Sequence, residues 1–154
     1  MSPRTISETI LRPVEPLLAT DTVEAAVGRL LELDLPALPA VDGQGRYAGI
    51  FGEREFLAAL FPGYLRELKG GKFLSRGIDD ALEKRDACRA EPIEGYLTTD
   101  HVEVDEDFSD AELAEIFFHH RVLIVPVLRD GRVSGIVTRH EFFRAAGERF
   151  VHRT

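Results

Sequence analysis

The chain of 154 residues has a single cysteine, Cys88, and no long apolar run. A lone cysteine cannot form an internal disulfide, and no activating motif surrounds Cys88, so we expect an ordinary residue and not a redox-sensing thiol. No stretch approaches the roughly 18 apolar residues of a membrane span, and Met1–Arg4 lacks the apolar run of a signal peptide. We therefore expect a cytoplasmic protein without membrane contact.

The chain also has few basic residues, since its 19 Lys and Arg are outnumbered by 27 Asp and Glu, which gives a net charge of −8. Binding to a phosphate backbone needs clustered cations, so nucleic acid is not expected as a partner. Residues 61–90 are the only cationic region, with 7 basic and 5 acidic side chains. This central stretch therefore differs in character from the rest of the chain.

No catalytic set is evident, since no serine, cysteine or histidine lies in a nucleophile-elbow, zinc-ligand or paired-carboxylate pattern. Lys69–Lys72 fails as a phosphate loop because Phe73 stands where the hydroxyl should be. The acidic run Asp100–Asp107 could bind a divalent cation, or it could form a solvated strand and then cap a helix. His119 and His120 are expected at a helix end. We therefore predict a binding module and not an enzyme.

An internal duplication dominates the sequence. Residues 35–41 and 49–57 correspond to residues 123–128 and 135–143, at offsets of 87 and then 86. A repeat of this kind predicts two copies of one structural unit. The chain is also 44% hydrophobic, which is enough for a compact core.

Each copy predicts the order strand, helix, strand, strand, helix. The first helix of copy one follows Asp21 or Thr22, either of which can cap it, and that of copy two follows Ser109. Their apolar stripes have helical spacing and consist of Val23, Ala26, Val27, Leu30 and Leu31 in one copy and Leu113, Ile116 and Phe117 in the other. Two apolar runs around a Gly/Asp turn then predict a hairpin, and a second short helix follows.

This order and three motifs, Leu38–Asp42, Val125–Val127 and Gly135–Glu141, resemble the cystathionine-β-synthase (CBS) domain family, whose members usually occur as tandem pairs. The resemblance covers roughly residues 6–60 and 92–147. It implies an α/β fold in which two β-α-β-β-α repeats pack as a pseudo-two-fold pair. We expect a first repeat at 1–60, a helical insertion at 61–91 and a second repeat at 92–154.

The resemblance also implies that adenosine-containing ligands bind in the cleft between the repeats. Thr138 would contact phosphate or ribose and Glu141 the ribose diol, although the family more often has aspartate there. The backbone amides at a helix start favour an anion, but both residues also suit ordinary helix capping. The full set of expected ligand-binding residues is Thr138, Glu141, Arg139, His140, Ile124, Val125 and Pro126.

The corresponding site in the first repeat is expected to be weaker and consists of Glu55, Arg54 and Leu38. Gly52 occupies the Thr138 position, so the hydroxyl is missing, and replacing Gly52 by alanine is expected to change binding little. Family members that read phosphate often have a basic residue at the positions of Ala37 and Ile124. Their absence leaves S-adenosylmethionine open beside AMP, ADP and ATP, of which AMP or ADP is the first expectation.

Two function classes remain open from the sequence. In one, the chain is a stand-alone regulatory module that needs no cofactor, senses an adenosyl ligand and acts on an unknown effector protein. In the other, it is a ligand-free scaffold that uses its insertion to dock a partner.

In the insertion we expect a turn into a short helix over Phe61–Leu68, a break at Gly70-Gly71 and a second helix from Ile78 to Arg85. The insertion either packs against the pair or forms a docking surface or a lid over the ligand cleft. The side chains expected to pack are Phe61, Tyr64, Leu68, Phe73 and Leu82. A homodimer is expected through the second helices, whose apolar residues are Phe56, Leu57, Leu60, Phe142, Phe143 and Ala146.

Overall fold

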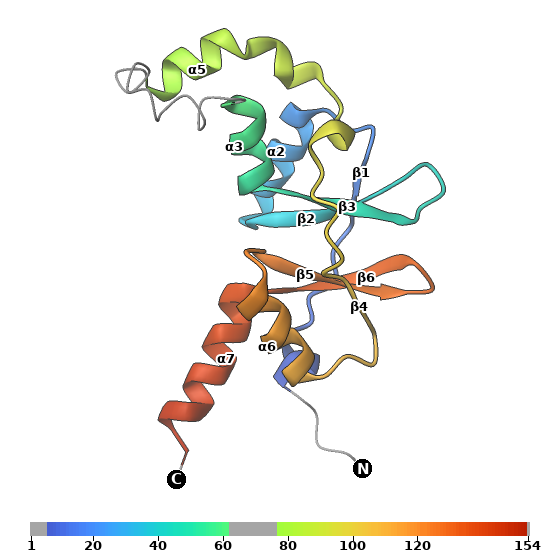
Figure 1. The fold of residues 1–154 in the computed structure, drawn as a ribbon, viewed down its shortest axis with the longest axis vertical. Coiled ribbons are helices and arrows are strands. Elements are labelled where there is room, and N and C mark those ends of the chain that lie inside the picture. Colours follow the sequence, from blue (N-terminus) through green and yellow to red (C-terminus); the bar gives the residue numbers. More distant parts are fainter. Residues whose placement is uncertain (1–5, 62–76, 154) are drawn as a thin grey trace.

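The computed structural model describes residues 6–61 and 77–153 and contains two halves of the same β-α-β-β-α order (Figure 1). The first half, preceded by α1 (Ile6–Ile10), consists of β1 (Leu17–Leu18), α2 (Val23–Leu33), β2 (Ala37–Val41), β3 (Tyr47–Gly52) and α3 (Glu53–Leu60). The second consists of β4 (Val104–Asp105), α6 (Asp110–His119), β5 (Ile124–Arg129), β6 (Arg132–Thr138) and α7 (Arg139–Val151). The predicted α/β duplication is confirmed.

Each half forms a three-stranded sheet with the same topology. The orders are β1-β2-β3 and β4-β5-β6, with a parallel first pair and an antiparallel hairpin. Pro39 pairs with Ile50, and Pro126 pairs with Ile136 in the second sheet. The sheets lie next to each other in the middle of the molecule, with α2 and α3 on one half and α6 and α7 on the other (Figure 1).

The first helix of each half begins at a side-chain cap. The Thr22 hydroxyl accepts from the Ala25 N–H at 3.1 Å, and the Ser109 hydroxyl accepts from the Glu112 N–H at the same distance. Asp21, the other predicted cap, instead accepts a hydrogen bond from the Leu18 N–H. The helical stripe of α2 is narrower than predicted, because Leu31 is 77% exposed.

The segments that precede the two halves are exchanged between them. Arg12 pairs with Ile136 of β6 through backbone hydrogen bonds of 2.8 and 2.9 Å. Thr98 pairs in the same way with Ile50 of β3, through two bonds of 2.9 Å. Each half therefore receives an extra strand-like segment from the linker of the other, and the N-terminal segment runs from α1, beside α6 and α7, to β1 in the first sheet (Figure 1).

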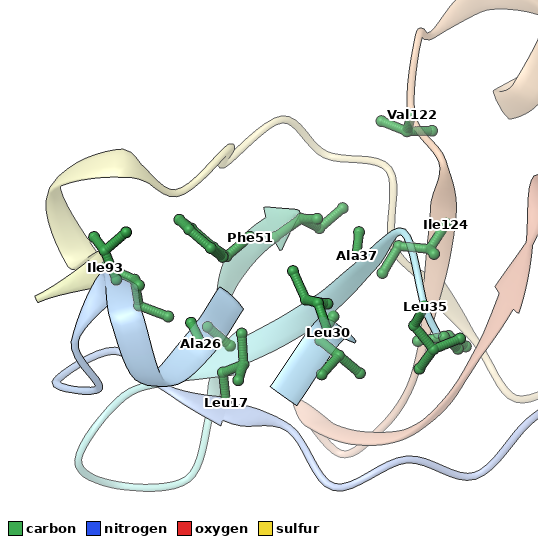
Figure 2. Packing of buried hydrophobic residues seen from close by; sticks show 14 of the residues in the cluster. Leu17, Ala26, Leu30, Leu35, Ala37, Phe51, Ile93, Val122 and Ile124 are labelled. Carbon is green, nitrogen blue, oxygen red and sulfur yellow. The ribbon is translucent and has the colours of Figure 1, made fainter. Parts of the chain in front are cut away.

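One hydrophobic core spans both halves. The main cluster contains Leu35 and Ala37 of the first half together with Val122, Ile124 and Ile136 of the second (Figure 2). Full burial of such a side chain stabilises the fold by about 1.5–3 kcal/mol. The halves therefore form one folding unit and not two independent domains.

The N-terminal helix is anchored to the second half by Asp110, the first residue of α6. Its carboxylate accepts hydrogen bonds from the Ile6 N–H at 3.1 Å and the Ser7 N–H at 2.9 Å, and also from the Ser7 hydroxyl. Burial alone would raise the pKa of Asp110, but these hydrogen bonds outweigh it and lower the pKa below its usual value. The anchor therefore favours an ionised carboxylate.

The insertion contains α5 (Ile78–Lys84) and two short 3₁₀ helices, η2 (Asp86–Ala90) and η3 (Ile93–Tyr96). The predicted helix at 78–85 is confirmed. Ala81, Cys88 and Ile93 are buried in this segment, whereas Leu82 is 45% exposed and lines a hollow next to α2 and α3, so its predicted packing is only partial.

Phe61 is partly buried, as expected of a packing residue. Tyr64, Leu68, Phe73 and the predicted break at Gly70-Gly71 lie outside the described residues. Among the described helices none is long and apolar enough to cross a membrane.

Because the exchanged N-terminal segment lies against β6, we predict that Gly135 cannot be replaced by a larger residue without loss of stability. A Cβ there would lie 2.7 Å from the Arg12 carbonyl oxygen and 3.0 Å from Leu11 Cδ1, whereas a Cβ at Gly28 on α2 would meet nothing within 4 Å. Gly135→Ala should lower the free energy of unfolding by about 1–3 kcal/mol, as overpacking does. Gly28→Ala, the matched control, should raise it by about 0.5–1 kcal/mol. Urea denaturation checks both values, and equal stabilities for the two variants would contradict the close approach at Arg12.

Candidate functional site

The second half places Thr138 and Glu141 together where β6 passes into α7. The Thr138 hydroxyl accepts from the Glu141 N–H at 3.1 Å and donates to Glu141 Oε1 at 3.3 Å. Thr138 is only 4% exposed. It is thus the N-cap of α7, and a hydroxyl with one proton and two lone pairs keeps one acceptor position for another group.

Glu141 presents a carboxylate to solvent at this junction, since its side chain is 40% exposed. Arg139 and His140 are exposed in the same first turn, where the helix dipole favours an anion. The Arg139 N–H itself donates to the Leu123 carbonyl, and the Glu141 N–H donates to Thr138. The Arg12 guanidinium lies 3.9 Å from Glu141 Oε1. Arg12 did not emerge from the sequence pattern, although its offset of 86 from Thr98 marks the two as equivalent residues.

The predicted residues of β5 divide between two environments. Ile124 pairs with Thr138 and belongs to the core shared by both halves. Val125 faces the core of the second half, as the alternation of a strand requires. Pro126 is also buried. Of the three, Ile124 is therefore the residue that lies next to Thr138.

The corresponding junction in the first half is closed by its own side chains. Glu55 is 8% exposed, and its Oε2 accepts a 2.5 Å hydrogen bond from the Thr98 hydroxyl. Arg54 is also engaged, since its Nη1 donates to the Arg121 carbonyl at 2.7 Å. The cavity at this point has a volume of about 10 Å³ and is lined by Ala37, Ile50, Arg54, Glu55, Thr98, Val122 and Leu123. That space is barely enough for one water molecule.

Gly52 is required by packing in this closed junction. A Cβ at Gly52 would lie 2.4 Å from both the Ala37 Cβ and the Pro36 carbonyl oxygen. Alanine at this position would therefore disturb the packing, and threonine would fit still less well. That alanine changes ligand binding little stays a prediction. Leu38, the other residue assigned to this site, is fully buried in the main core.

A second kind of surface lies on the helices of the first half. Two hollows of about 410 and 390 Å³ share Val27, Leu31 and Phe56. The second of them is completed by residues of the insertion, Leu82, Arg85, Asp86, Cys88 and Arg89. Their largely apolar lining suits a protein side chain better than a nucleotide.

Neither a metal centre nor an activated tyrosine emerges from residues 6–61 and 77–153. No group of three or more His, Cys, Asp or Glu side chains in these ranges could hold a metal ion, including the acidic run at 100–107. Burial, and then the negative charges of Glu103 and Asp100, raise the pKa of Tyr47, so its hydroxyl stays neutral.

Comparison with known proteins identifies the repeat. A family model for the CBS domain matches residues 6–62 and 93–148, well over half of the chain. The crystal structure of CBSX2 in complex with AMP is similar, with a TM-score of 0.65 and 19% identity over 94% of this chain and 96% of that one.

Two further solved structures have the same architecture. One is the CBS domain of a CBS domain-containing membrane protein from Sphaerobacter thermophilus, with a TM-score of 0.65 and 23% identity over 91% of each chain. The other is a CBS domain-containing protein of unknown function from Kribbella flavida, with a TM-score of 0.67 and 17% identity over 94% of this chain and 99% of that one. Identities this low establish the shared fold alone.

Proposed function

The chain belongs to the CBS domain family and contains the domain twice, and from this we propose that it is a regulatory module that binds an adenosine-containing ligand at the Thr138–Glu141 junction. It acts in the cytoplasm, without catalysis and without a required cofactor. Ligand binding changes its conformation or dimer packing, and an effector protein responds to that change. The AMP complex of the similar protein CBSX2 supports this ligand class.

The observation that carries the proposal is the exposed Glu141 carboxylate beside a buried hydroxyl at the start of α7. A carboxylate accepts hydrogen bonds from both hydroxyls of a ribose, and the adjacent helix start stabilises a negative charge. AMP or ADP supplies both groups and is the first choice. ATP and S-adenosylmethionine are weaker candidates of the same class.

Only one such site per chain is proposed. The Glu55 carboxylate already accepts a hydrogen bond from the Thr98 hydroxyl, and the Arg54 guanidinium already donates one to the Arg121 carbonyl. A ligand there would have to break a buried hydrogen bond and open a cavity that is nearly filled. The weaker site expected around Glu55, Arg54 and Leu38 is therefore proposed to stay empty.

A scaffold function is the second candidate, and the hollows on α2 and α3 favour it. Their shared wall of Val27, Leu31 and Phe56 and the contribution of the insertion form an apolar surface that could receive a partner's side chain. Early proteolytic cleavage around Gly70-Gly71 or after Lys72 would favour this alternative.

A thermal-shift series tests the proposed function. AMP, ADP, ATP or S-adenosylmethionine should raise the Tm, because a ligand that binds only the folded state stabilises it. Thr138→Ala should weaken binding by about tenfold, because it removes both the acceptor position open to a ribose hydroxyl and the hydrogen bond that orients the Glu141 carboxylate. Glu141→Ala should weaken binding of every ligand with an intact ribose diol.

Thr138→Ser is the matched control, because it keeps the hydroxyl that caps α7 and should bind within about threefold of the wild type. Binding is compared by calorimetry well below the Tm, since Thr138→Ala also loses about 0.5–2 kcal/mol of capping stability. If both alanine variants bound AMP like the wild type, the site would lie elsewhere. If no adenosyl ligand raised the Tm, the scaffold function would be preferred.

Homodimerisation is a further part of the proposal. The second-half helices expose Phe118, Phe143, Phe150 and Val151, with Phe150 73% exposed. Large exposed apolar side chains favour association with another protein surface. Light scattering at tens of micromolar should give about twice the chain mass of 17.2 kDa.

Phe150→Glu should shift that mass toward a single chain, since Phe150 contributes little to the core. Gln44→Glu in the exposed β2–β3 turn carries the same added charge and should leave the dimer unchanged. A wild-type particle of one chain mass would count against the dimer.

A further inference from the structure

The exchanged linkers give the two junctions different partners. Arg12 and Thr98 are equivalent by their offset of 86, and each pairs with the middle of the last strand of the other half. Thr98 reaches Glu55 and closes the first junction with a 2.5 Å hydrogen bond. Arg12 reaches Glu141 but stops 3.9 Å away, so the second junction has a cation where the first has a hydroxyl.

The backbone fixes Arg12 while its charged end stays available. Two hydrogen bonds hold it to Ile136, and Gly135 allows the close approach of its carbonyl. The Arg12 and Glu141 side chains are 43% and 40% exposed. An ion pair of this exposure contributes little to stability, so a ligand can replace it at low cost.

We propose that Arg12 reads the phosphate of the ligand, while Glu141 holds the ribose. This inference rests on the proposed function and adds a residue from the N-terminal segment to the site. A 5′-phosphorylated ribose carries two hydroxyls on its ring and an anion on the adjoining C5′ arm, and these match a carboxylate and a guanidinium that lie close together. Arginine binds phosphate oxygens with two parallel N–H donors, which gives both affinity and geometry.

The assignment of phosphate binding to Arg12 also explains how the site could bind phosphate although Ala37 and Ile124 stand where family members often have a basic residue. Neither can meet a phosphate from the middle strands, and the exchanged linker supplies the charge instead. The site then reads phosphate through a segment that is remote in sequence from Thr138 and Glu141. Selectivity for nucleotide over nucleoside is assigned to Arg12.

The test compares AMP with adenosine by calorimetry in the wild type and in Arg12→Gln. The wild type should bind AMP at least about tenfold more tightly than adenosine. In Arg12→Gln this preference should fall below about threefold, with the affinity for adenosine itself changed by less than about threefold. Arg12→Lys keeps the charge without the forked donors and should give an intermediate preference.

Arg144→Gln is the control, because it removes the same charge from α7 at a residue that pairs with Glu148 and not with Glu141. It should keep the full preference for AMP. An unchanged preference in Arg12→Gln would overturn the inference and leave the proposed function standing. Loss of the preference in Arg139→Gln or His140→Gln, with Arg12→Gln unaffected, would assign phosphate reading to the first turn of α7 instead. If the wild type bound neither compound, the proposed function would fail, and this inference with it.

Discussion

The two linkers of this protein cross between its halves, Arg12 to β6 and Thr98 to β3. Each linker adds backbone hydrogen bonds to the last strand of the other half, so neither half completes its sheet with its own sequence. The exchange brings Ile50 and Ile136 into one core and requires glycine at the two points where the linkers cross, Gly49 and Gly135. A pair of repeats thereby becomes a single folding unit.

The same exchange makes the two junctions unequal, although the repeats share one topology. In the first junction, Thr98 of the linker and Gly52 at the end of β3 pack closely around the buried Glu55. In the second junction, the linker has Arg12 and β6 ends at Thr138, and Glu141 stays exposed next to the positive charge of Arg12. Two residue differences at equivalent positions, Arg12 against Thr98 and Thr138 against Gly52, therefore separate a packed junction from a proposed ligand site, with no change in the fold.

The sequence predicted the parts of this structure that depend on local pattern. The duplication, the order of elements and the caps at Thr22 and Ser109 are confirmed, because each depends on neighbouring residues. The role of Arg12 could not be predicted locally, since its pairing with Ile136 joins residues 124 positions apart. The packing demand at Gly52 and the exposure of Leu31 and Leu82 likewise depend on how elements approach one another. The ligand itself stays a prediction from the family and the site chemistry.

The central claim is that the exchange leaves one usable site per chain, and the binding stoichiometry tests it most directly. Isothermal titration of the full chain with AMP, at protein concentrations above the Kd, measures the number of ligands bound. The account predicts one AMP per chain, and Glu55→Gln should leave that number unchanged. Two equivalent sites per chain would contradict it, because the junction closed by Glu55 and Thr98 would then have to open at no greater cost than the exposed one.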